Sequence, residues 1–135
     1  MPILCYNRKK ETRRLFMEDR RLPHDHGQHI EFLADKLPTA EHFSVLAELF
    51  RQLGDASRIR IFWLLCHCEE CVINLSAMMD MSSPAVSHHL KLLKTAGLIT
   101  SRREGKEVYY KSVDSADAHA LHDMIEILLS IKCPL

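Results

Sequence analysis

The chain has 135 residues, 47% hydrophobic and 27% charged, which is typical of one globular domain with an additional arm. No apolar run approaches the roughly 18 residues of a membrane-spanning helix, and five cysteines, an odd number, argue against a disulfide scaffold. The N-terminus carries charges where a signal peptide has its apolar core, so we expect a cytoplasmic protein with reduced thiols and no membrane partner.

The formal net charge is zero, but the charges are unevenly distributed. Residues 1–21 hold seven Lys/Arg against three acidic residues, and residues 82–111 hold six against two, so each stretch has a net charge of +4. Residues 22–81 carry −5 and residues 112–135 carry −3. A local basic stretch attracts a polyanion even in a neutral protein, so residues 82–111 are a candidate nucleic-acid-binding segment.

The first part of the chain is predicted to be a basic N-terminal arm with one short helix, residues 1–38. Pro23 and the polar run 24–29 interrupt the arm, and residues 30–37 form a short amphipathic segment. The main domain is predicted to cover residues 39–135.

Three helices are predicted in the first half of the main domain. One has apolar residues at helical spacing from Phe43 to Leu53 and ends at Gly54. The next begins at Asp55 and is apolar on nearly all sides, which is typical of a central helix. A short third helix, residues 72–81, follows a cysteine-rich turn.

A capped helix over residues 82–96 follows, with Pro84 in its first turn and Gly97 as its C-terminal stop. Residues 98–113 change to a β-prone pattern around Glu104-Gly105, which predicts a hairpin, and residues 115–132 form a last helix. This order predicts a mainly α, winged helix-turn-helix fold, with five or six helices and a two-stranded β-hairpin wing.

The helix over residues 82–96 has one apolar face and one polar face, as a helix in the DNA major groove needs. Its capped N-terminus offers free N–H groups to a phosphate, and the hairpin tip adds three cations that a wing would place on the DNA backbone. The predicted DNA contacts are Ser82, Ser83, Ser87, His88, His89, Lys91, Lys94, Arg102, Arg103 and Lys106.

Three segments, LGDASRIRIFWLL, SSPAVSHHLKLLKTAGLI and SRREGKEVYYKSV, closely resemble the ArsR/SmtB-type bacterial transcriptional repressors. The resemblance covers about residues 41–132 and leaves the arm unmatched. It implies a homodimer whose first and last helices pair and which binds an inverted-repeat operator in double-stranded DNA. It also implies that an inducer, often a metal ion, releases the repressor from DNA.

The stretch CHCEECV, residues 66–72, holds three cysteines and a histidine. The family's thiolate sensors carry Glu-Leu-Cys-Val-Cys-Asp-Leu in the matching place; here Cys71 corresponds to the first cysteine, and Ile73 replaces the second. The predicted ligands of a soft inducer ion, Cd(II), Pb(II) or As(III), are Cys66, Cys68 and Cys71. His67 or Cys5 can add a fourth ligand for Zn(II). The alternative is that these cysteines are packed as small apolar residues.

A second candidate metal site lies in the last helix, with the ligands Asp117, His119, His122 and Glu126. Imidazole and carboxylate groups at positions i, i+3 and i+7 of one face can hold zinc or nickel. The family's dimer-spanning site uses Asp-x-His followed about ten residues later by His-x-x-Glu, and only the first half has a counterpart here. A polar, solvent-facing side of the last helix is the alternative interpretation.

The sequence therefore predicts a sequence-specific DNA-binding repressor released by a soft metal or metalloid ion, with no organic cofactor. One alternative is the same repressor with a thiol-redox input. A small zinc-dependent hydrolase is a distant alternative, because the chain has no HExxH motif, Gly-rich phosphate loop or nucleophile elbow. We therefore expect no enzymatic activity.

Overall fold

The computed structural model describes residues 22–133 except residues 25 and 29, so Cys5 and most of the predicted basic arm lie outside the described residues. The chain divides into two compact units, Met1–Ala40 and Glu41–Leu135. The described part of the first unit contains α2 (Glu31–Lys36), which lies within the short helical segment predicted from the sequence. None of the residues of α2 is buried.

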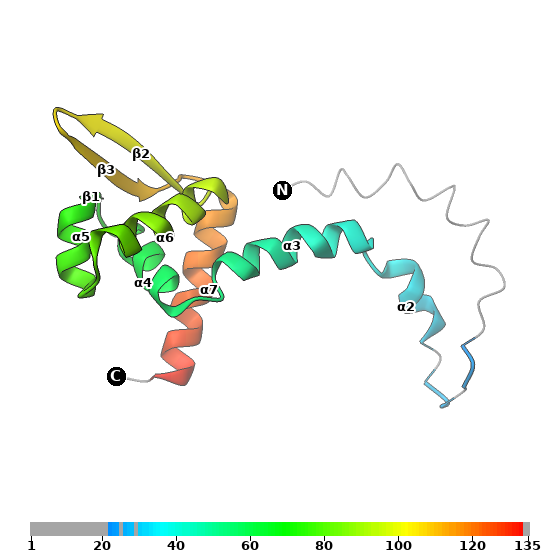
Figure 1. The fold of residues 1–135 in the computed structure, drawn as a ribbon. Helices are drawn as coiled ribbons and strands as arrows, with labels where there is room; N and C mark the ends of the chain where they lie inside the picture. Colours follow the sequence, from blue (N-terminus) through cyan, green and yellow to red (C-terminus); the bar gives the residue numbers. More distant parts are fainter. Residues whose placement is uncertain (1–21, 25, 29, 134–135) are drawn as a thin grey trace. The chain divides into compact units, whose positions relative to one another are not determined.

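The second unit contains five helices and three short strands (Figure 1). The helices are α3 (Ala40–Gln52), which starts at the boundary, α4 (Ala56–Leu65), α5 (Val72–Met79), α6 (Ser83–Thr95) and α7 (Ala116–Lys132). The strands are β1 (Glu70–Cys71), β2 (Ile99–Glu104) and β3 (Glu107–Ser112). The predicted mainly α fold with six helices in the described residues is confirmed. None of the described helices is long and apolar enough to cross a membrane.

Side chains at the helix starts explain where the helices begin. Asp55, Ser82 and Ser115 precede α4, α6 and α7, and each side chain accepts a hydrogen bond from the backbone N–H three residues on. Pro84 lies in the first turn of α6, where its missing N–H costs no hydrogen bond. Gly97 ends α6 with a φ of 75°, a left-handed conformation that glycine adopts without strain.

The turn between α5 and α6 is tight. Asp80 caps α5 in the left-handed region, with φ 53° and ψ 48°, and the backbone N–H of Met81 donates to the carbonyl of Ser76 at 3.1 Å. The chain therefore reverses within a few residues and enters α6, which packs against both α4 and α5. The helices α5 and α6 form the predicted helix-turn-helix.

The wing is a three-stranded antiparallel sheet in the order β1-β3-β2, and its β2–β3 hairpin projects from the helices (Figure 1). Gly105, with a φ of 61°, and Lys106 form the two-residue turn between β2 and β3. The strand β1 pairs with β3, so that Glu70 faces Tyr110 in the register and Cys71 faces Tyr109. The prediction of a two-stranded wing was incomplete, because the cysteine-rich stretch supplies a third strand.

A single hydrophobic core joins α4, α5, α6, α7 and the start of β2. Its largest fully buried side chains are Phe62, Ile61, Leu65, Leu75, Leu90, Leu93, Leu98 and Val86. By contrast, α3 buries none of its residues. The apolar residues that recur at helical spacing in its sequence do lie on a helix, but they are not among the buried residues of the core. The second half of α7 is also exposed: Leu128 and Leu129 are 48% and 45% exposed.

Candidate DNA-binding surface and metal-ligand cluster

The polar face of α6 lies opposite its buried face. The residues that α6 buries are Val86, Leu90 and Leu93. Ser87, His88 and Lys91 are exposed, and the side chains of Ser87 and Lys91 make no hydrogen bond or ion pair within the described part of the chain. These three groups are therefore available to base edges and phosphates in a major groove.

Other predicted DNA contacts on α6 are engaged within the protein. The Ser83 hydroxyl lies 3.2 Å from the hydroxyl of Ser76, and the Lys94 ammonium donates to the Ser101 hydroxyl at 2.6 Å. The ring of His89 is half-buried, and its Nδ1 is a buried polar atom without a hydrogen-bond partner among the described residues. The Ser82 hydroxyl caps α6. The geometry thus favours His88 over His89 as a reader of bases.

The two arginines of the wing have different surroundings. Arg102 donates to Glu69 at 2.8 Å from Nε and to Glu104 at 2.6 Å from Nη1, and its guanidinium lies 4.9 Å from the ring centre of Tyr109. The hydrogen bond from Arg102 lowers the pKa of Glu69. Arg103 is exposed and makes no ion pair with a described residue. Arg102 therefore fastens the cysteine-rich stretch to the wing, and Arg103 is open to DNA.

Lys106, at the tip of the wing, is also exposed. It follows Gly105 in the turn, and its side chain makes no ion pair among the described residues. Its ammonium group can therefore reach a phosphate without first breaking a contact within the protein.

The three cysteines of the predicted soft-metal site lie at the end of α4 (Cys66), in the segment that follows it (Cys68) and on β1 (Cys71). Cys66 is half-buried, and burial raises the pKa of its thiol. The Cys68 thiol donates to the carbonyl of Leu64 at 3.4 Å, and burial together with the charge of Glu70 raises its pKa. Cys71 is buried. The three sulfurs do not form a group of atoms all within 4.8 Å of one another, so this site stays a prediction.

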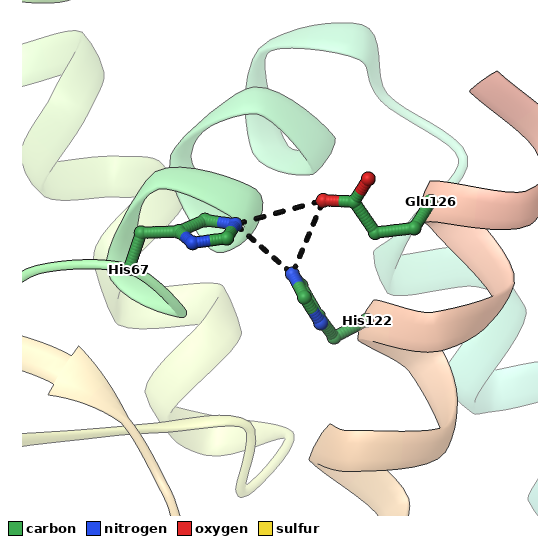
Figure 2. A group of neighbouring side chains, drawn as sticks. All are labelled: His67, His122 and Glu126. Atoms are coloured by element: carbon green, nitrogen blue, oxygen red, sulfur yellow. Dashed lines mark hydrogen bonds and ion pairs between the residues drawn. The ribbon is translucent and has the colours of Figure 1, made fainter. Parts of the chain in front are cut away.

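The structure brings together a different set of potential ligands (Figure 2). His67, in the turn after α4, faces His122 and Glu126 on α7. The Nε2 atoms of the two histidines are 3.0 Å apart, and Oε1 of Glu126 lies 3.6 Å from Nε2 of His67 and 3.4 Å from Nε2 of His122. We call these three residues the His-His-Glu cluster. It combines one residue from the first predicted site with two from the second.

The remaining two predicted ligands on α7 do not join this cluster. His119 Nε2 lies 2.6 Å from Oδ1 of Asp114, and Asp117 is exposed in the first turn of α7. Sequence reasoning also missed Trp63, whose indole N–H donates to Oε1 of Glu126 at 2.6 Å. The spacing of four residues between His122 and Glu126 was a usable signal, but no local pattern indicates that residue 67 meets residue 122.

Comparison with known proteins identifies the family. The family model described as "Bacterial regulatory protein, arsR family" matches residues 55–101, which run from the N-cap of α4 into β2. A transcriptional repressor SmtB homolog from Synechocystis sp. is 34% identical over 90 residues, which are 67% of this chain and 68% of that protein. The chain belongs to the ArsR family.

Two other ArsR-type relatives have names that refer to metal resistance. The arsenical resistance operon repressor of Escherichia coli is 40% identical over 70 residues, 51% of this chain and 60% of that protein. A cadmium resistance regulatory protein CadC homolog of Staphylococcus aureus is 39% identical over 70 residues, 51% of this chain and 58% of that protein. The matches therefore span somewhat more than half of the length of each of these two relatives.

A solved structure supports the assignment of the fold. It is the homodimeric winged helix-turn-helix DNA-binding domain of a possible ArsR-family regulator from Mycobacterium bovis. Its TM-score to this chain is 0.61, and the two sequences are 26% identical. The matched region covers 70% of this chain and 86% of the M. bovis chain. The predicted winged helix-turn-helix is thus confirmed. Since the relatives are transcriptional regulators, the prediction that this ArsR-family chain is not an enzyme is confirmed as well.

Proposed function

We propose that this protein is a cytoplasmic, homodimeric repressor that binds an inverted-repeat operator and leaves it when a soft metal or metalloid ion binds. The observation that carries the DNA-binding part is the exposed face of α6 beside the wing. Ser87, His88 and Lys91 lie on the exposed face of α6, and the DNA major groove is wide enough to admit an α-helix. Arg103 and Lys106 lie on the hairpin, at the position from which a wing contacts the DNA backbone. Phosphate contacts position such a protein, and base contacts give it specificity.

The apolar residues left exposed on α3 and α7 support the homodimer. On α3 they are Phe43, Val45, Leu46 and Phe50, and on α7 they are Ile127, Leu128, Leu129 and Ile131; each is at least 44% exposed. Apolar surface of this kind on two helices is typical of an interface with another protein. In a symmetric dimer, a second copy of the chain would cover the exposed apolar residues of both helices in one interface. The M. bovis domain is itself a homodimer.

The position of the cysteine-rich stretch in the wing sheet supports an input through its thiols. Cys71 lies on β1, which pairs with β3, and Glu69 is bonded to Arg102 on β2. An ion gathered by Cys66, Cys68 and Cys71 has to move these side chains or the backbone of this stretch, because the sulfurs are not grouped. That change would act on β3 and on Arg102, and so on the wing's fit to DNA. A hundredfold loss of DNA affinity corresponds to about 2.7 kcal/mol of coupling free energy.

The state of the thiols favours an ion over an oxidant as the input. A redox-sensing cysteine needs a lowered pKa and an accessible thiolate. Burial instead raises the pKa of Cys66 and Cys68. A soft ion displaces the thiol protons when it binds, so its affinity is expected to increase with pH.

An anisotropy titration tests the proposal, with full-length protein and DNA from upstream of its own gene, repeated with Zn(II), Cd(II), As(III) and a mild oxidant. We expect specific binding without metal and release by Cd(II) or As(III). A Cys68→Ser, Cys71→Ser double variant should bind DNA normally and ignore both ions, and a His119→Ala control should respond like the wild type. Absence of specific DNA binding would overturn the repressor, and release of the double variant by the same ion concentrations would overturn the thiol input.

A further inference from the structure

The His-His-Glu cluster joins two segments that are far apart in the sequence. His67 lies in the turn after α4, and His122 and Glu126 are one turn apart on α7, with all three ligand atoms directed to a common point (Figure 2). Their side chains are partly accessible: His122 is 23% exposed, and His67 and Glu126 are each 46% exposed. An ion can therefore enter from solvent while the site remains attached to two packed elements.

The distances in the cluster match a tetrahedral ion site. Around an ion with bonds of about 2.0–2.1 Å, tetrahedrally arranged ligand atoms are about 3.3–3.4 Å apart. The three separations among Nε2 of His67, Nε2 of His122 and Oε1 of Glu126 are 3.0, 3.6 and 3.4 Å. An ion at normal bond length from all three atoms fits with only small movements of the side chains.

A neighbouring side chain holds the carboxylate in place. The indole N–H of Trp63 donates to Oε1 of Glu126 at 2.6 Å, and the Trp63 ring lies 4.4 Å from the ring of His67 between centres. Trp63 is on α4, one turn before His67. The end of α4 and the turn after it therefore carry the ligand His67 and, through Trp63, also hold the carboxylate of Glu126 on α7. Hydrogen bonds of this kind to a ligating carboxylate orient it and increase metal affinity.

We propose that His67, His122 and Glu126 form a binding site for a divalent cation of the zinc class, Zn(II), Co(II) or Ni(II). Two imidazoles and one carboxylate suit these borderline ions, whereas As(III) and Pb(II) prefer thiolates. The site uses none of the three thiols of the proposed function, although His67 lies between Cys66 and Cys68 in the same stretch. It also differs from a site built from the four predicted ligands of α7, because His119 and Asp117 are not part of it.

Co(II) titration of the full-length protein tests the site, because Co(II) reports its own ligands by absorption. We expect one Co(II) per protomer, a visible ligand-field band, no sulfur-to-metal charge-transfer band from this site, and displacement by Zn(II). Glu126→Gln and His67→Ala change exposed side chains, and each should weaken Co(II) binding at least tenfold. Trp63→Phe keeps an aromatic ring but removes the N–H, and it should weaken binding about 10- to 100-fold.

Two control variants separate this site from its neighbours. His119→Ala alters an imidazole on the same helix, outside the cluster, and should leave the Co(II) spectrum and affinity unchanged. A Cys66→Ser, Cys68→Ser, Cys71→Ser variant should keep the ligand-field band even if it loses its response to As(III). The site is overturned if the Glu126→Gln and His67→Ala variants, shown to be folded by circular dichroism, bind Co(II) as the wild type does. It is also overturned if the triple serine variant abolishes all Co(II) binding.

Discussion

Arg103→Ala is expected to weaken binding to every DNA sequence and to make that binding less sensitive to salt. Arg103 is exposed on β2 and makes no ion pair with a described residue, so a DNA phosphate is its available partner. Each neutralised phosphate contributes about 0.9 to the slope of log K against log salt concentration. A homodimer carries two copies of Arg103, so the slope should become less steep by about 1.8. Between about 50 and 200 mM salt, this changes the ratio of wild-type to variant affinity about twelvefold.

Arg102→Ala is the matched control, because it removes the same charge one residue earlier. Arg102 is already bonded to Glu69 and Glu104, so its loss should leave the salt slope close to that of the wild type. Anisotropy titrations of both variants at four salt concentrations, on operator and on unrelated DNA, measure the two slopes. If both substitutions reduce the salt slope equally, the reasoning that Arg103 contacts a DNA phosphate while Arg102 is held within the protein is refuted.

Three other predictions concern base reading, stability and assembly. His88→Ala should change the ranking of operator variants by about 1–3 kcal/mol at one base pair, whereas Lys91→Ala should lower all affinities alike; competition binding with a set of operator variants distinguishes these outcomes. Asp55→Ala should cost about 1 kcal/mol in urea unfolding at pH 7, and Asp55→Asn much less. The hydrogen bond from the backbone N–H of Arg58 lowers the pKa of Asp55 below its ordinary 3.8. This stabilisation is therefore present above pH 3.8 and is lost as the pH falls through the lower pKa that Asp55 has in the folded protein. An Asp55→Ala variant whose free energy of unfolding depends on acid pH as the wild type's does would contradict this reasoning. Val45→Glu should produce monomers in sedimentation equilibrium, and an unchanged dimer would remove α3 from the interface.

Helix α6 and the hairpin were predictable because their signals are local. Ser82, Pro84 and Gly97 define the two ends of α6 within a few residues, and the turn at Gly105 defines the hairpin. The exposure of α3 was not predictable in the same way. A helical apolar stripe looks the same whether it packs inside its own chain or against a second chain, and its members, such as Phe43, are exposed here.

Contacts between distant segments account for what the sequence did not reveal. The strand β1 has only two residues, and it exists because Glu70 and Cys71 pair with β3 almost forty residues later. The His-His-Glu cluster likewise depends on a contact between residues 55 positions apart. The residue types suited to metal binding were recognised from the sequence, but their grouping is decided by how α7 packs beside the end of α4.

Trp63 is the only tryptophan in the chain, and it contacts both His67 and Glu126. The protein's intrinsic emission, excited selectively at the indole, therefore comes from one place: the edge of the His-His-Glu cluster. A movement of the His67 ring, a movement of the Glu126 carboxylate or the arrival of an ion each alters the surroundings of this single indole. The chain thus contains an unlabelled optical probe of that cluster, and because Trp63 and Leu129 line the same pocket, a dimer that forms through α7 would also reach this probe.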